Sequence, residues 1–120
     1  MTDVISLMKR WSNGTVIPKP EAVGVFKVKG WGKRRGEDAL IYLIPNQNGG
    51  KPYQKGITVS EFRAAYKQLS NTGTLTCEWF KDKLPECYRE GSCNFTTVGG
   101  LFELAGLAAR GERGEYVRTA

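Results

Sequence analysis

The sequence contains no histidine among its 120 residues. That absence excludes catalytic triads and zinc sites that require an imidazole, and it removes the side chain that most often acts as a general base near neutral pH. Long apolar runs are also missing, since none approaches the roughly 18 residues of a membrane-spanning helix. Residues 1–6 lack the basic-then-apolar order of a signal peptide. We therefore expect a cytoplasmic protein with no membrane partner.

Cysteine is scarce, and the three cysteines are widely spaced at Cys77, Cys87 and Cys93. An odd number without a Cys-x-x-Cys pair fits no common metal site and no disulfide framework. A bridge between Cys87 and Cys93 would need an oxidising compartment, to which no other feature of the sequence points. We expect free thiols, no bound metal and no cofactor.

A chain of this length can bury roughly two thirds of its unfolded surface without help from disulfides or metals. With 40% hydrophobic and 25% charged residues, it has the composition of an ordinary globular domain. We expect a single α+β domain over residues 1–120. Its predicted parts are a helix plus a basic β-hairpin at 1–45, a loop at 46–56 and a helical half at 57–120.

The first part combines a helical and an alternating pattern. Apolar residues at positions 4, 7, 8 and 11 have the spacing of an amphipathic helix, which we place at 3–12 with Thr2 or Asp3 as its N-cap. Residues 22–29 then alternate as a strand, and the glycine-rich residues 30–36 are predicted to turn. The apolar run 39–44 follows as a second strand that is covered on both faces. The prediction is a hairpin with a basic tip, packed on helices.

The second part opens on a strong helix-start signal. Thr58 and Glu61 form a capping box, so a helix is predicted to begin at Val59 and to end near Gly73. A short extended piece at 74–76 follows, and Thr76 can cap a second helix that stops near Pro85.

A third helix is predicted at 95–109, with an apolar face wide enough to be mostly buried. Its three glycines, at 99, 100 and 106, each cost about 1 kcal/mol relative to alanine, so we attribute them to close backbone packing. A turn at 110–114 and a last strand at 115–118 complete the chain.

This order of helix, short strand, two helices, basic turn and strand over residues 57–118 resembles a winged-helix domain. The resemblance implies that the helix at 95–109 lies where a recognition helix lies, and that Arg110 and Arg113 belong to the wing. Two features depart from that pattern: the connection at 85–94 is long, and Glu103 is the one charged residue of the helix. The alternative is that the C-terminal half is a compact helical core that does not contact bases.

The net charge of +6 is concentrated in one half of the chain. Residues 1–60 hold ten Lys and Arg against four Asp and Glu, whereas residues 61–120 hold eight against eight. Between positions 9 and 35 there are eight basic residues and a single acid, Glu21. Such asymmetry is typical of a surface that faces a polyanion, although lysines and arginines kept for solubility would give the same count.

The leading functional expectation is therefore a small, non-enzymatic nucleic-acid-binding protein, with DNA favoured over RNA. Basic side chains of the hairpin would neutralise phosphates, while Trp31 would stack on a base or fold back over the hairpin. The candidate binding residues are Lys27, Lys29, Trp31, Lys33, Arg34, Arg35, Arg110 and Arg113.

Two other classes of function stay open. Trp11, Trp79, Tyr88 and Tyr116 offer aromatic surface for a protein-binding adaptor that self-associates as a homodimer. An enzyme is the third class, with Glu37-Asp38 and Asp82-Lys83 as its acidic pairs, but neither spacing is diagnostic of a metal nuclease.

Overall fold

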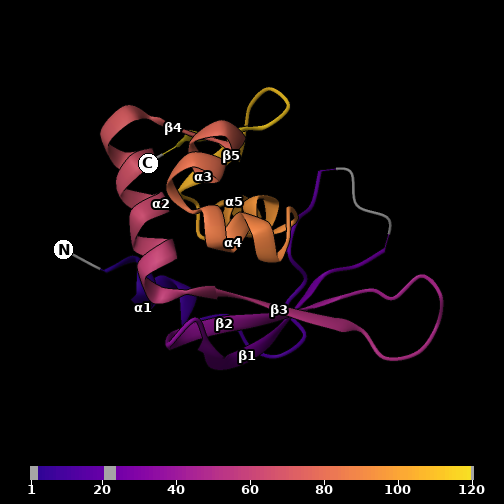
Figure 1. Cartoon of the computed structure of the whole chain (residues 1–120). Coiled ribbons are helices and arrows are strands. Elements are labelled where there is room, and N and C mark those ends of the chain that lie inside the picture. Colours follow the sequence, from indigo (N-terminus) through magenta and orange to yellow (C-terminus); the bar gives the residue numbers. More distant parts are fainter. Residues whose placement is uncertain (1–2, 21–23, 120) are drawn as a thin grey trace.

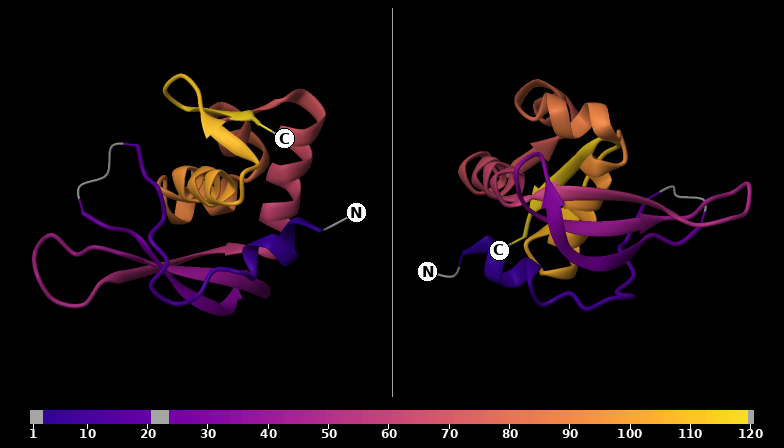
Figure 2. Two further views of the ribbon diagram at one scale, coloured as in Figure 1. Left: turned by 180° about the vertical axis from the view of Figure 1, so that it is seen from behind. Right: turned by 60° about the horizontal axis from the view of Figure 1, so that its bottom comes forward.

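Two antiparallel sheets lie at opposite ends of the molecule with helices between them (Figures 1 and 2). The structure is a computed structural model that describes residues 3–20 and 24–119. The hairpin sheet has the strand order β1-β2-β3, and the C-terminal sheet has the order β4-β6-β5. The α+β prediction is confirmed, and one hydrophobic core cluster joins both halves.

The bounds of the elements follow the chain. The helices are α1 (Val4–Met8), α2 (Val59–Thr72), α3 (Cys77–Lys83), α4 (Pro85–Glu90) and α5 (Asn94–Leu104). The strands are β1 (Lys27–Arg34), β2 (Glu37–Ile44), β3 (Tyr53–Thr58), β4 (Thr74–Thr76), β5 (Ala108–Arg110) and β6 (Glu115–Arg118). Within the described residues, no helix is both long enough and apolar enough to cross a bilayer.

The hairpin is present, but its turn is tighter than predicted. β1 continues through Lys33 and Arg34, which the sequence placed in a turn over 30–36. The connection to β2 is formed by Arg35 and Gly36 alone, both with positive φ, +48° and +77°. Gly30, at φ +151°, lies instead at a bulge inside β1. The predicted strand 22–29 begins only at position 27, and residues 22 and 23 of it lie outside the described residues.

A third strand replaces the end of the predicted loop at 46–56. β3 pairs antiparallel with β2 over its whole length, from Tyr53 opposite Ile44 to Thr58 opposite Ala39. The sequence hides this strand because its outer half is polar and exposed and because Gly56 interrupts it. Thr58 ends β3 and caps α2 at the same time, so the strand leads into the helix without a loop.

The observed helices start where the sequence predicted them wherever a capping residue is present. Asp3 caps α1, Thr76 caps α3, and the capping box at the start of α2 is confirmed. The helix predicted at 3–12 is shorter, ending at Met8. The stretch predicted as a connection after Pro85 forms a further helix, α4, in which Pro85 takes the first-turn position that proline tolerates.

The predicted helix 95–109 is wrong at its end. α5 stops at Leu104, Gly106 has φ +75°, and Ala108–Arg110 form strand β5. Gly106 is therefore a helix stop, while close packing explains the other two glycines. A Cβ on Gly99 would lie 2.1 Å from the ring of Tyr116, and one on Gly100 would lie 2.3 Å from the carbonyl oxygen of Pro18.

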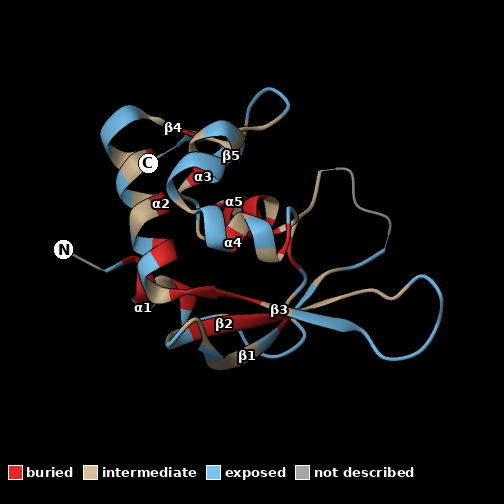
Figure 3. Cartoon of the chain, in the orientation of Figure 1, coloured by how far each residue is buried: buried red, intermediate tan, exposed pale blue. Residues whose placement is uncertain are grey.

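The core fills the space between the two sheets, and Figure 3 shows its buried residues gathered on β2, α5 and the inner face of α2. Aromatic rings make many of the contacts: Phe95 meets both Phe80 and Tyr116 edge to face, with ring centroids 5.6 and 5.4 Å apart. The fully buried large side chains include Met8, Ile17, Leu40, Tyr42, Ile57, Phe62, Leu69, Phe80, Leu101, Phe102 and Tyr116.

The capping box gives a first testable prediction. In Thr58→Ala the N–H of Glu61 loses its side-chain acceptor, so we expect the free energy of unfolding to fall by about 1 kcal/mol. Urea denaturation measures this fall, with Ser12→Ala as the control because that residue is exposed and outside any helix. An unchanged midpoint for Thr58→Ala would contradict the role of the cap.

Candidate nucleic-acid interface

Six basic residues gather along β1 and the segment that follows α1. We call them the basic face: Lys9, Arg10, Lys27, Lys29, Lys33 and Arg34, of which Arg34 is half-buried beside Gly56 and the other five are exposed. Backbone hydrogen bonds between residues 14–17 and 26–28 hold the segment against the strand, and two side-chain contacts add to them. The Lys9 ammonium lies 5.8 Å from the centroid of the Trp31 ring, and Asn13 Nδ2 donates to the carbonyl oxygen of Lys29 at 2.9 Å. Lys9 and Arg10, which are absent from the candidate binding residues predicted from the sequence, thus join this surface.

Most of the charge on the basic face is not neutralised by the protein itself. Lys33 pairs with Asp38, and both side chains are largely exposed, 75% and 59%. Lys29 Nζ donates to the neutral Gln54 at 3.0 Å. Across the described ranges, neither Arg10 nor Lys27 takes part in an ion pair. Exposed cations in this state can bind an external anion without first breaking an internal pair.

The carboxylate of Glu37, the first residue of β2, binds the start of α2 and not a residue of the basic face. It accepts hydrogen bonds from the backbone N–H and the hydroxyl of Ser60 at 3.0 and 2.6 Å, at the start of α2. The other acidic pair noted in the sequence, Asp82-Lys83, is an exposed contact of 3.5 Å. No group of three His, Cys, Asp or Glu side chains that could hold a metal occurs among the residues that the structure describes.

Trp31 folds back over the hairpin. It pairs with Leu40 across the strands, is half-buried and packs against the core. Its indole Nε1 is buried and has no hydrogen-bond partner within the described chain. The sequence left open whether Trp31 stacks on a base or folds back over the hairpin. In the structure it folds back, and its ring is not available for stacking on a base.

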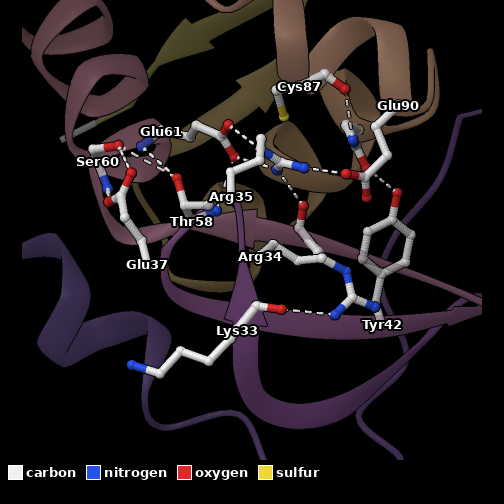
Figure 4. A network of polar contacts seen from close by, with 12 residues as sticks. Lys33, Arg34, Arg35, Glu37, Tyr42, Thr58, Ser60, Glu61, Cys87 and Glu90 are labelled. Atoms are coloured by element: carbon white, nitrogen blue, oxygen red, sulfur yellow. Dashed lines mark hydrogen bonds and ion pairs between the residues drawn. The ribbon is translucent and has the colours of Figure 1, made fainter.

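Arg35 belongs to the interior rather than to the basic face. Figure 4 shows its side chain reaching toward the helices, whereas Lys33 points the other way. Its guanidinium donates to both carboxylate oxygens of Glu61, at 2.7 and 2.8 Å, to the carbonyl oxygen of Gly56 at 2.8 Å, and to Glu90. Its side chain is 17% exposed. We therefore remove Arg35 from the candidate binding residues.

Glu61 serves two partners with one carboxylate. It accepts from the N–H of Thr58, which completes the capping box, and it binds Arg35. Burial by itself would raise the pKa of Glu61, but the hydrogen bonds from Arg35 and Thr58 outweigh burial and lower that pKa below its ordinary value. The hydrogen bond to Glu61 likewise raises the pKa of Arg35. The pair therefore stays ionised through the neutral range.

Arg110 and Arg113 lie on the C-terminal sheet, away from the basic face (Figure 1). Arg110 is half-buried in β5 and Arg113 is exposed in the turn before β6. The structure does not bring these two arginines together with the hairpin residues. They form a second basic position near the opposite end of the molecule.

The helix that the winged-helix resemblance would use for reading bases is covered. Eight residues of α5 are buried, and the carbonyl of Pro18 lies against Gly100. Asn94, the first residue of α5, is fully buried, and its side chain accepts from the hydroxyl of Tyr42 and donates to the carbonyl oxygen of Cys87. In this conformation α5 has no face wide enough to enter a major groove.

The ion pair of Arg35 gives a prediction with a matched control. Arg35→Met keeps the aliphatic length but leaves the partly buried carboxylates of Glu61 and Glu90 without their cation, so we expect a loss of about 3 kcal/mol. Lys33→Met removes an exposed pair two residues away and should cost less than about 1 kcal/mol. Equal losses in the two variants would show that the Arg35 pair does not stabilise the fold.

The same variant should respond differently to acid. In the parent the lowered pKa of Glu61 contributes stability that is present above its ordinary value of 4.5 and is lost as the pH falls below it. Without Arg35, burial dominates and raises the pKa of Glu61. Protonation of this carboxylate at low pH then removes a partly buried charge and stabilises the variant. The stability difference between parent and Arg35→Met should therefore shrink as denaturation is repeated from about pH 7 to about pH 4.

No protein-family model matches the chain, and comparison with curated proteins and with solved structures finds no match either.

Proposed function

We propose that the protein binds the phosphate backbone of duplex nucleic acid, DNA in preference to RNA, through the basic face and without catalysis. The observation that carries this proposal is the set of exposed cations on β1 and on the segment after α1 that have no carboxylate partner, Lys27 and Arg10 above all. Contacts of this kind depend on charge and give affinity without sequence preference.

Phe26 and Trp31, the aromatic residues beside and on β1, offer no stacking platform, which favours a duplex over a single strand. Proteins that hold single strands stack successive bases on aromatic rings. Trp31 is turned into the core, and the neighbouring aromatic residue Phe26 is half-buried against Tyr42, with ring centroids 6.3 Å apart. Lysine and arginine side chains that project from an edge strand can instead reach phosphates along a double helix.

The element order of the C-terminal half supports a winged-helix-like arrangement as part of this proposal. After α2, strand β4 pairs with β6, and β6 pairs with β5 across the turn that carries Arg113. Because α5 is covered, the contact with DNA would not pass through that helix. Arg113 would add a phosphate contact of its own if a long duplex crosses both ends of the molecule.

The protein-binding alternative has less support. Its aromatic residues are largely consumed by the fold: Tyr116 is 1% exposed, and Trp11, Trp79 and Tyr88 are half-buried against the core. The apolar side of α1 is likewise covered, with Val4, Ile5 and Met8 buried. The three free thiols fit the reducing cytoplasm, which is the location we propose.

Fluorescence anisotropy with a labelled DNA duplex between about 50 and 200 mM salt tests the proposal. The triple variant with Arg10, Lys27 and Lys29 changed to Gln should bind more weakly to all sequences, and its log-log salt slope should fall by roughly two to three because fewer counterions are released. The matched control changes Lys67, Lys81 and Arg89 to Gln, which removes the same charge from α2, α3 and α4. Its slope should stay close to that of the parent.

Three results would count against the proposal in different ways, the third of them from the same assay repeated with a single-stranded probe. No measurable affinity of the parent for any nucleic acid near 50 mM salt would overturn it. Equal losses in the two triple variants, with melting temperatures unchanged, would show that net charge rather than the basic face determines binding. Tighter binding of the single-stranded than of the duplex probe would overturn the duplex assignment alone.

A further inference from the structure

A cavity of about 330 Å³ opens between the start of α5, the segment at 17–20 and the turn that joins β5 to β6. That volume lies in the range of small-molecule sites. Much of its wall is apolar, with Phe26, Phe95 and Tyr116 as its rings and Pro20 beside them. The basic face of the proposed nucleic-acid interface contributes no residue to it.

Lys19 supplies a cation to this wall. Its ammonium donates to the carbonyl oxygen of Cys93 at 2.9 Å and to the hydroxyls of Thr96 and Thr97 at 2.8 and 2.7 Å, and it lies 4.4 Å from the centroid of the Phe26 ring. All three acceptors are neutral. No ion pair joins Lys19 to a carboxylate within residues 3–20 and 24–119.

A partly buried ammonium without a counter-ion is costly, and burial lowers the pKa of Lys19 to about 8. Near neutral pH the side chain is still mostly protonated. The cavity therefore carries an ammonium whose charge is met by dipoles and rings but by no anion.

Other ionisable groups also face the cavity. Arg110 and Arg113 enter from the C-terminal sheet, and Glu115 is the one carboxylate that the described part of the chain places in the wall. Two thiols, Cys77 and Cys93, also line it. Tyr42, whose ring centroid lies 5.7 Å from the Lys19 ammonium, has a pKa raised far above its ordinary value, chiefly by burial, and stays neutral.

We propose that this cavity binds a small molecule with an apolar, ring-sized body and one anionic group, the anion facing Lys19 and Arg113 and the body lying against Phe26, Phe95 and Tyr116. Such a ligand supplies the counter-ion that Lys19 lacks and covers the apolar wall. The basic face takes no part in this site, and Arg113 is the one residue that it shares with the proposed contacts to DNA.

Titration calorimetry with two probes of the same shape tests the site. 1-Naphthoate carries the anion, and 1-naphthalenemethanol replaces it with a neutral hydroxymethyl group. At about pH 6.5 the full chain should bind one naphthoate, about tenfold or more tighter than the alcohol, because the anion forms a charge-assisted contact with Lys19. At about pH 9.5, above the pKa of Lys19, this preference should shrink severalfold because Arg113 alone then faces the anion, while the affinity for the alcohol should hardly change.

Lys19→Met removes the ammonium and keeps the length of the side chain, so the preference for naphthoate should shrink at the lower pH as well. Lys67→Met is the matched control, since Lys67 is an exposed residue of α2 that does not line the cavity. Chemical-shift changes on naphthoate binding should centre on Thr96 and Tyr116.

The proposal is overturned if neither probe binds saturably, if both bind equally at about pH 6.5, or if Lys19→Met retains the full preference. Should Lys19→Met fail to fold, as its thermal melt would show, the comparison of the two probes on the parent at the two pH values decides the question by itself.

Discussion

The contact between Arg35 and Glu61 joins the two halves of the molecule, and much of the architecture depends on it. The side chain of Arg35 starts in the hairpin turn and extends to α2, α4 and the end of β3. There its guanidinium binds two carboxylates and the carbonyl oxygen of Gly56. Arg35 adopts φ +48°, a conformation that is costly for a residue with a side chain. We infer that the ion pair offsets this cost, and that it fixes how the hairpin sheet sits on the helices.

With Arg35 turned inward, the basic face is carried by its neighbours on β1. β1 is an edge strand of the hairpin sheet, and lysines on edge strands also discourage pairing with other chains. The same side chains thus have a structural use and a proposed binding use. The salt dependence of DNA binding separates these two uses, because protection of an edge requires no bound polyanion.

Sequence patterns predicted the elements that local chemistry determines. The capping box at Thr58 and Glu61, the Thr76 cap and the apolar strand 39–44 all lie where the sequence placed them. The features that were missed depend on distant partners. β3 is polar in its outer half and becomes a strand through its pairing with β2, and Arg35 looked like a surface cation because its carboxylate partners lie 26 and 55 residues further along. The turn of Trp31 into the core could not be read from two flanking glycines.

The glycines of α5 have a further consequence. Gly99 lies against the ring of Tyr116 from the C-terminal sheet, and Gly100 lies against the Pro18 carbonyl of the N-terminal segment. At these two positions only the backbone of α5 separates the helix axis from the segments that pack against it. Any side chain at either position would act as a spacer and push the layers apart. Relatives of this chain, however far they have diverged on the surface, should therefore keep the smallest residue at both positions, and this adjacent pair is a signature by which they can be found.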